Sequence, residues 1–170
     1  MLTTSIRFSK IHFLVLSALL VILGAAASNA PASPAPSSKI YAQKLIEETL
    51  AAHQELDALA ISATPPGKTQ CVTIASDEAK EIGEDCDEEE LTAMKTNSPL
   101  VQKEMENGKD TYDVTIPIHD ASGKVIATAG IDFDPDPNQS EAKVTERAQQ
   151  IAKEIEAKVP SKEKLFAPAS

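Results

Sequence analysis

Acidic side chains are the most frequent groups in this sequence that could do chemistry. Glu84–Glu90 holds six acids in seven positions, and Asp132–Asn138 has an oxygen-bearing side chain at every second position. A calcium-binding EF-hand loop needs Gly at its sixth position and Glu at its twelfth, where this chain has Pro137 and Lys143. An EF-hand is therefore excluded. A solvated helix start is favoured for Glu84–Glu90, with weak divalent-cation binding as the alternative.

Cys71 and Cys86 are the only cysteines of the chain. An even number of cysteines in an exported protein predicts a disulfide, and closing a loop of this length would stabilise the fold by about 3 kcal/mol. Two unrelated thiols remain the alternative, because the sequence does not give the distance between the two Cα atoms. No C-x-x-C occurs, so thioredoxin-like redox chemistry has no support.

Histidines and the common catalytic motifs give no sign of an enzyme. His53 lies on the apolar stripe of a predicted helix and His119 lies beside a predicted hairpin loop, so a structural role is favoured for both. The sequence contains no H-x-x-x-H pair, G-x-S-x-G, P-loop or G-x-G-x-x-G. We therefore expect neither enzymatic activity nor a bound metal or cofactor.

The chain divides into a leader, a linker and one domain. Residues 1–27 have the basic start, apolar core and small-residue exit of a secretory signal peptide. The apolar core is shorter than the roughly 20 residues of a membrane span, so cleavage is favoured over an uncleaved anchor. Residues 28–37 are rich in Pro, Ala and Ser and are interpreted as a linker. A single domain is predicted over 38–164, with 165–170 as a flexible tail, in a periplasmic or secreted protein.

The charge balance excludes two classes of partner. The chain has 16 basic and 26 acidic residues, and removing the leader with Arg7 and Lys10 leaves 14 basic residues and no fewer acids. Nucleic-acid binding needs a clustered positive face, and adhesion to an anionic membrane needs basic residues as well. We therefore expect no nucleic-acid partner and no membrane contact after cleavage.

The apolar periodicity predicts helices and strands in alternation. Spacings of three and four residues, together with start and stop signals, predict helices over 40–56, 77–82 and 85–96, the second ended by Gly83, and one or two helical turns within 100–106. A final helix is predicted to begin with a capping box formed by Asn138 and Glu141. Period-two alternation predicts strands over 59–63, 70–76, 112–118 and 125–133, the last two as a hairpin in which Pro117 marks a bulge or an edge. This order predicts an α+β fold with an antiparallel sheet.

The hairpin resembles the final hairpin of Cache domains, which are extracytoplasmic PAS-like sensor domains of bacteria. The likeness rests on Ile116-Pro117-Ile118, on the Asp-x-x-Gly-Lys pattern of 120–124, and on Gly130 near the end of the return strand. Upstream, residues 72–77 with Ile82-Gly83 are similar to the segment of an apolar strand, Ala-Ser and Ile-Gly in that family. The resemblance covers about residues 40–133.

The resemblance implies a long N-terminal helix on a PAS-like antiparallel sheet, with a small-molecule pocket between the sheet and the connecting helices. It implies a small metabolite such as an organic acid or amino acid as ligand, and it places Asp132 where the family often has a ligand-contacting acid. From their positions on the predicted strands, Thr73, Tyr112 and Thr128 are predicted to face the pocket with it.

The predicted function is therefore an exported, non-enzymatic, sensor-like module that binds a small molecule. The main alternative is a structural or protein-interaction module of the cell envelope, which a homodimer through the first helix would favour. A weaker alternative is cation buffering by the Asp134–Asp136 and Glu84–Glu90 clusters.

Overall fold

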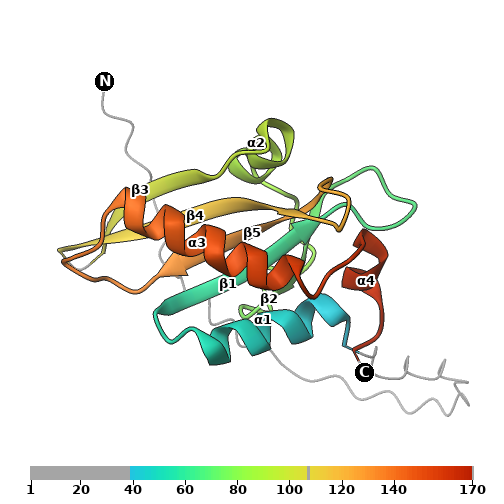
Figure 1. Ribbon diagram of the computed structural model, residues 1–170, viewed down its shortest axis with the longest axis horizontal. Coiled ribbons are helices and arrows are strands. Elements are labelled where there is room, and N and C mark those ends of the chain that lie inside the picture. Colours follow the sequence, from blue (N-terminus) through green and yellow to red (C-terminus); the bar gives the residue numbers. More distant parts are fainter. Residues whose placement is uncertain (1–38, 107, 170) are drawn as a thin grey trace, which may run out of the picture. The chain divides into compact units, whose positions relative to one another are not determined.

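The fold is an open sheet of five antiparallel strands with helices packed on it, in the order β2-β1-β5-β4-β3 (Figure 1). The computed structural model describes residues 39–106 and 108–169, and the predicted leader (1–27) and linker (28–37) lie outside this part of the chain. The elements are α1 (Tyr41–Ala52), β1 (Leu56–Ala63), β2 (Val72–Ser76), α2 (Glu88–Thr96), β3 (Leu100–Glu106), β4 (Lys109–His119), β5 (Val125–Phe133), α3 (Glu141–Glu156) and α4 (Lys162–Phe166). The predicted fold class, α+β with an N-terminal and a C-terminal helix on an antiparallel sheet, is confirmed.

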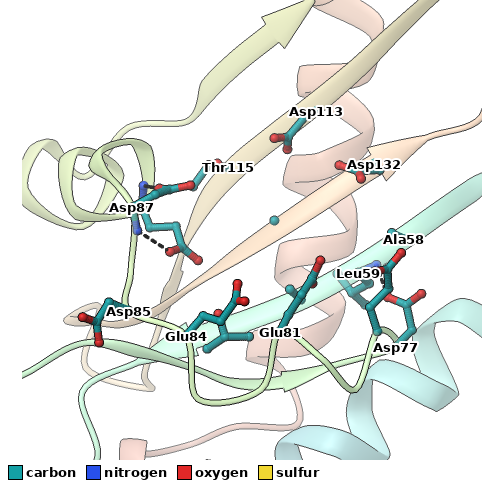
Figure 2. A pocket seen from close by; sticks show the side chains of 15 residues that line it. Ala58, Leu59, Asp77, Glu81, Glu84, Asp85, Asp87, Asp113, Thr115 and Asp132 are labelled. Atoms are coloured by element: carbon teal, nitrogen blue, oxygen red, sulfur yellow. Dashed lines mark hydrogen bonds between the residues drawn. The ribbon is translucent and has the colours of Figure 1, made fainter. Parts of the chain in front are cut away.

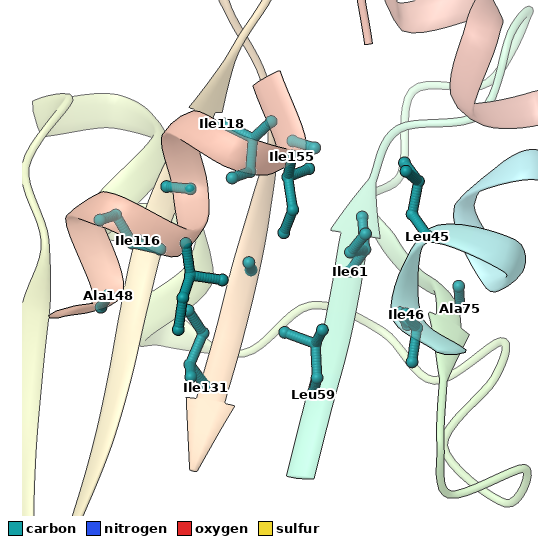
Figure 3. Close-up of a cluster of buried hydrophobic side chains, with 14 of the residues drawn as sticks. Leu45, Ile46, Leu59, Ile61, Ala75, Ile116, Ile118, Ile131, Ala148 and Ile155 are labelled. Carbon is teal, nitrogen blue, oxygen red and sulfur yellow. The ribbon is translucent and has the colours of Figure 1, made fainter. Parts of the chain in front are cut away.

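The hydrophobic core lies between one face of the sheet and the helices α1 and α3 (Figure 3). Alternation along β4 and β5 sends one set of side chains to this face, including Ile118 and Ile131, which are fully buried. Helix α3 contributes its apolar stripe at helical spacing, with Ala148 and Ile155 among its buried residues. Tyr112 belongs to this core.

Sequence reasoning was wrong about two segments before β4. Residues 100–106 form strand β3 rather than helical turns, because they pair with β4 from Leu100↔Thr115 to Glu106↔Lys109. Residues 77–83 form turns instead of a short helix. Gly83 has a φ of +95°, so it does adopt the left-handed conformation that was predicted for it.

Helix ends differ from the prediction by a few residues. Helix α1 ends at Ala52 because β1 already begins at Leu56, which pairs with Phe133. The predicted capping box at Asn138 is not formed: Ser140 is the N-cap of α3, and its hydroxyl accepts from the Lys143 N–H. Pro117 lies beyond the last pairing of β4 with β3, and a register shift against β5 follows between Ile118 and His119, so the predicted irregularity is present.

The packed unit extends beyond the predicted end of the domain at 164. Leu165 is fully buried, in the short helix α4. The Tyr41 N–H donates to the Ala167 carbonyl and the Ala169 N–H donates to the Lys39 carbonyl, both at 2.7 Å. Residues 165–169 are therefore part of the fold and not a flexible tail. Among the described residues, no helix is long and apolar enough to cross a membrane.

Candidate functional site

A cavity of about 320 Å³ lies on the face of the sheet that is turned away from the hydrophobic core (Figure 2). The sheet supplies its floor, and the connection from β2 to α2, residues 77–87, supplies a wall that we call the acidic wall. Nine of the fifteen lining residues are acids, and none is Lys, Arg or His: Asp77, Glu78, Glu81, Glu84, Asp85, Asp87, Glu90, Asp113 and Asp132. We call this space the acidic cavity.

Small side chains on the central strands make the hollow. Ala58 and Ala60 of β1 and Gly130 of β5 line the floor, and a Cβ added at Gly130 would have no atom within 4 Å. Thr73 of β2 and Thr115 of β4 line it as well. Because larger residues would fill this space, the small residues of four strands, β1, β2, β4 and β5, leave a cavity above this face of the sheet.

Two carboxyl groups stand on this floor side by side. Asp113 of β4 and Asp132 of β5 are register partners, so their side chains project to the same face from adjacent strands. Burial is the main cause that raises the pKa of Asp113 to about 7, and the charge of Asp132 adds to it. Burial likewise raises the pKa of Asp132 to about 6, with Asp57 and Glu81 as further causes. Oδ1 of Asp113 is buried without a hydrogen-bond partner among the described residues.

The acidic wall is tied to the edge of the sheet by hydrogen bonds of its backbone and of its side chains, among them those from Ser76 to Glu81 and from Gln70 to Asp85. The Thr73 N–H donates to the Glu84 carbonyl at 2.9 Å, and the Gly83 N–H donates to the Thr73 carbonyl at 2.8 Å. At the start of the wall, the Asp77 carboxylate accepts from the Leu59 N–H at 2.9 Å. The wall therefore runs along β2 and directs Glu81 and Glu84 toward the floor (Figure 2).

The wall ends where α2 begins. The Asp87 carboxylate accepts from the Glu90 N–H, and the Glu90 carboxylate accepts from the Asp87 N–H, forming a capping box. Burial is the largest cause that raises the pKa of Glu90. The predicted helix start within Glu84–Glu90 is thus present, and the same acids also line the cavity.

The predicted disulfide is formed between Cys71 and Cys86, whose Cα atoms are 5.3 Å apart. Cys71 directly precedes β2, and Cys86 directly precedes Asp87, the N-cap of α2. The Cys86 N–H also donates to the Cys71 carbonyl at 3.1 Å. The bridge therefore joins the start of β2 to the end of the acidic wall.

The four predicted pocket residues fall in three different places. Thr73 and Asp132 line the acidic cavity. Thr128 shares the sheet face of Asp132 but is not among the lining residues; it is fully buried, and its hydroxyl has no partner among the described residues. Tyr112 is on the opposite face, in the core, which corrects the pocket assignment for this residue.

Sequence reasoning missed Asp113 and the role of the wall. Asp113 alternates with Tyr112 and Val114 along β4, so the same alternation that predicted the strand places Asp113 opposite the core. The predicted alternation along β4 was therefore right, and the error was to assign Tyr112 and Asp132 to one pocket. Directly opposite residues of paired strands share a face, and the residue opposite Asp132 is Asp113. The acidic run was visible in the sequence, but its position over the sheet depends on tertiary structure.

Both histidines are held in hydrogen-bond networks away from the acidic cavity. His53 is buried, with Nδ1 2.8 Å from Arg147 Nη2 and Nε2 2.8 Å from Glu154 Oε2. His119 has Nδ1 2.6 Å from Glu156 Oε1 and Nε2 2.6 Å from Asn97 Oδ1. The predicted structural role fits both residues. In the part of the chain that the structure describes, no group of three or more His, Cys, Asp or Glu residues is arranged to hold a metal ion.

Comparisons with known proteins found solved structures of low sequence identity and no match among sequence families. No family model and no curated protein matches the sequence. Solved structures with a similar architecture include the Agobacterium tumefaciens repressor BlcR, at 15% identity over 72% of this chain and 68% of that chain, with a TM-score of 0.49. The GAF domain of A. aeolicus nlh2 is 14% identical over 76% of this chain and 86% of that chain, with a TM-score of 0.49.

A Light-Oxygen-Voltage domain is also similar, at 11% identity over 61% of this chain and 93% of that chain, with a TM-score of 0.35. None of these three is a Cache domain, and the resemblance to that family stays a prediction.

Proposed function

We propose that this chain is an exported, PAS-like module that binds a small organic cation in the acidic cavity without transforming it. The observation that carries this proposal is the composition of the cavity: nine carboxyl groups line it and no basic side chain does. Its volume of about 320 Å³ is at the lower end of the range of small-molecule sites, roughly 300–1,000 Å³.

The negative charge of the residues that line the cavity determines which class of ligand it favours. A space enclosed by one sign of charge concentrates the field, so it attracts cations and repels an organic acid. The charge of the lining thus favours a ligand different from the organic acids that the Cache resemblance implies. Because the described carboxyl groups do not form a metal-binding arrangement, an extended molecule with several ammonium groups fits better than a single metal ion.

The floor of the cavity supplies the specific contacts. Asp113 Oδ1 is buried and accepts no hydrogen bond, so it lacks the donor that a buried carboxylate oxygen needs. An ammonium group placed between Asp113 and Asp132 would donate to both carboxylates and relieve their mutual repulsion. The acids of the wall would bind a second ammonium group at the other side of the cavity. A polyamine has this chemistry.

Export is supported by the predicted leader and by the cysteines. The leader resembles a signal peptide, and disulfides persist in oxidising compartments such as the periplasm and the cell exterior. Binding without catalysis is proposed because the residues that line the cavity include no Ser, Cys, Lys or His, although carboxyl groups and two threonines are present.

Thermal unfolding and calorimetry of the protein with its disulfide formed test the proposal against a panel of spermidine, putrescine, calcium and succinate. Spermidine at a hundred times its Kd is expected to stabilise by about 2.7 kcal/mol, which is roughly 5–10 °C in Tm. Recovering the spermidine unchanged after incubation would support binding without catalysis. A shift by succinate alone would overturn the cationic ligand, and a shift by calcium alone would favour cation buffering. No shift at all would leave the interaction module as the better function.

Two double variants show whether the acidic cavity is the binding site. D113N/D132N removes the two charges of the floor and is expected to weaken spermidine binding at least tenfold. E141Q/E146Q removes two exposed charges of α3 outside the cavity and serves as the matched control. Equal loss in both variants would mean that spermidine binds the acidic surface in general.

A further inference from the structure

The disulfide closes the segment that carries most of the charge of the acidic cavity. Five of the nine lining acids lie between Cys71 and Cys86, and two more, Asp87 and Glu90, follow within four residues of Cys86. Only the remaining two acids, Asp113 of β4 and Asp132 of β5, lie on strands. The bridge is therefore positioned to control the wall of the cavity as a whole.

The acidic wall has few apolar contacts with the domain. No residue of 77–92 is buried, and Ile82, its large apolar side chain, is 46% exposed. Apart from the disulfide, the wall is held by hydrogen bonds: those of the backbone at Thr73, Gly83 and Cys86, that of Asp77 with Leu59, and the side-chain bonds from Ser76 to Glu81 and from Gln70 to Asp85. Segments with few buried apolar contacts open at a low free-energy cost compared with global unfolding.

Charge repulsion acts to open the cavity. The wall directs Glu81 and Glu84 toward the floor that carries Asp113 and Asp132 (Figure 2). Carboxylates held close together in a partly desolvated space repel one another, and no basic side chain among the lining residues offsets them. The disulfide and the backbone hydrogen bonds therefore hold the wall in place against this repulsion.

We propose that the Cys71–Cys86 disulfide is a redox latch: oxidised, it holds the acidic wall over the sheet, and reduced, it lets the wall open and the ligand leave. The consequence for the ligand rests on the proposed function, whereas the opening of the wall does not. Cys86 is half-buried and Cys71 is buried, so an external thiol reaches Cys86 first.

The step is ordinary thiol–disulfide exchange. A thiolate of an external dithiol attacks Cys86 Sγ, the Cys71–Cys86 bond breaks, and Cys71 leaves as a thiolate that takes up a proton. The second thiol of the reductant then attacks the mixed disulfide and releases Cys86. The protein gains two electrons and two protons, and the dithiol becomes a disulfide.

Hydrogen exchange on the oxidised and the dithiothreitol-reduced protein tests the latch without any ligand. We expect the amides of Thr73, Gly83 and Cys86 to lose protection about tenfold or more on reduction, while Val114 and Ile131 stay protected. Unchanged protection at the three wall amides would overturn the latch. Loss of protection at Val114 and Ile131 as well would also overturn it, because the disulfide would then stabilise the whole domain.

Calorimetry with spermidine in both redox states tests the effect on binding. Reduction is expected to lower the affinity at least tenfold, reoxidation is expected to restore it, and an unchanged affinity would overturn the latch. The C71S/C86S variant is the matched control: it should behave as the reduced protein and should not respond to dithiothreitol. If the oxidised protein binds no spermidine, the proposed function fails, and the exchange experiment still decides whether the wall opens.

Discussion

Asp113 and Asp132 face each other on adjacent strands, two carboxyl groups in register on the same face of the sheet. Like charges directly opposite in a sheet are destabilising, and neither residue has a basic neighbour among the residues that line the cavity. A stable fold would favour a neutral or opposite pair at these positions. Under the proposed function, this repulsion is a cost of placing two carboxyl groups where they can bind a cation.

Stability without ligand should fall as the pH rises from 5 to 8. Both pKa values lie above the ordinary value for Asp, at about 7 for Asp113 and about 6 for Asp132, so folding favours the protonated forms. The stabilising contribution is complete below about pH 4 and is lost as the pH rises through 6 and 7. Discounted for partial solvent exposure, the effect is on the order of 2 kcal/mol, or roughly 4–8 °C in Tm. Melting curves of D113N/D132N should lack this part of the pH dependence, and a wild-type profile in that variant would contradict the assignment.

Affinity for spermidine should rise over the same pH range. A cation prefers the ionised pair, so binding at pH 6 must displace protons from Asp113 and Asp132. Calorimetry in two buffers of different ionisation enthalpy should show proton release at pH 6 and little at pH 8.5. An affinity that does not change with pH would place the ligand away from this pair.

Thr128 should be replaceable by valine with a gain in stability. Its hydroxyl is fully buried and has no hydrogen-bond partner among the described residues, and valine has nearly the same shape. Removing an unsatisfied buried hydroxyl is expected to stabilise by about 1 kcal/mol, measured by urea unfolding. The matched control is Thr73→Val, because Thr73 Oγ1 accepts from the Ser62 hydroxyl at 3.2 Å and its loss should destabilise. A destabilised T128V would mean that this hydroxyl has a partner such as a buried water.

His53 should contribute more to stability than His119. The side chain of His53 is 7% exposed and links Arg147 to Glu154, whereas that of His119 is 27% exposed. His53→Ala would leave a cavity and remove the imidazole that joins Glu154 to Arg147, although Arg147 keeps its bond to Glu55. The expected cost is about 2–4 kcal/mol, and His119→Ala should cost about 1 kcal/mol. Urea unfolding of both variants gives the comparison, and equal costs would contradict it.

Leu165 should be needed for the fold. Its side chain is fully buried, so Leu165→Ala is expected to cost about 2–5 kcal/mol by the loss of apolar contact and the cavity left behind. Lys162→Ala, at a half-exposed position of the same short helix, should cost less than about 0.5 kcal/mol. A stability unaffected by L165A would restore the view of this segment as a tail.

The sequence was sufficient to predict those elements whose position a local pattern of residues determines. Alternation located β4 and β5, and the acids before Leu91 located the start of α2. It failed where distant pairing decides: residues 100–106 are polar and helix-compatible, yet they form β3 because β4 offers a free edge. Likewise, Asp132 was expected to contact a ligand, but Asp113 and the acidic wall join it only after β4 and β5 pair and the wall folds back along β2.

The two ends of the described chain lie side by side, so the arrangement of the strands does not depend on where the chain starts. Ile40 forms a bridge with Pro168, and Ala169 bonds to Lys39, so the domain begins and ends at one point. A short peptide could join these ends, and new termini could be opened at the hairpin between β3 and β4 without moving any strand of the sheet. By the same geometry, the domain could be inserted whole into a surface loop of another protein without moving any strand of its sheet.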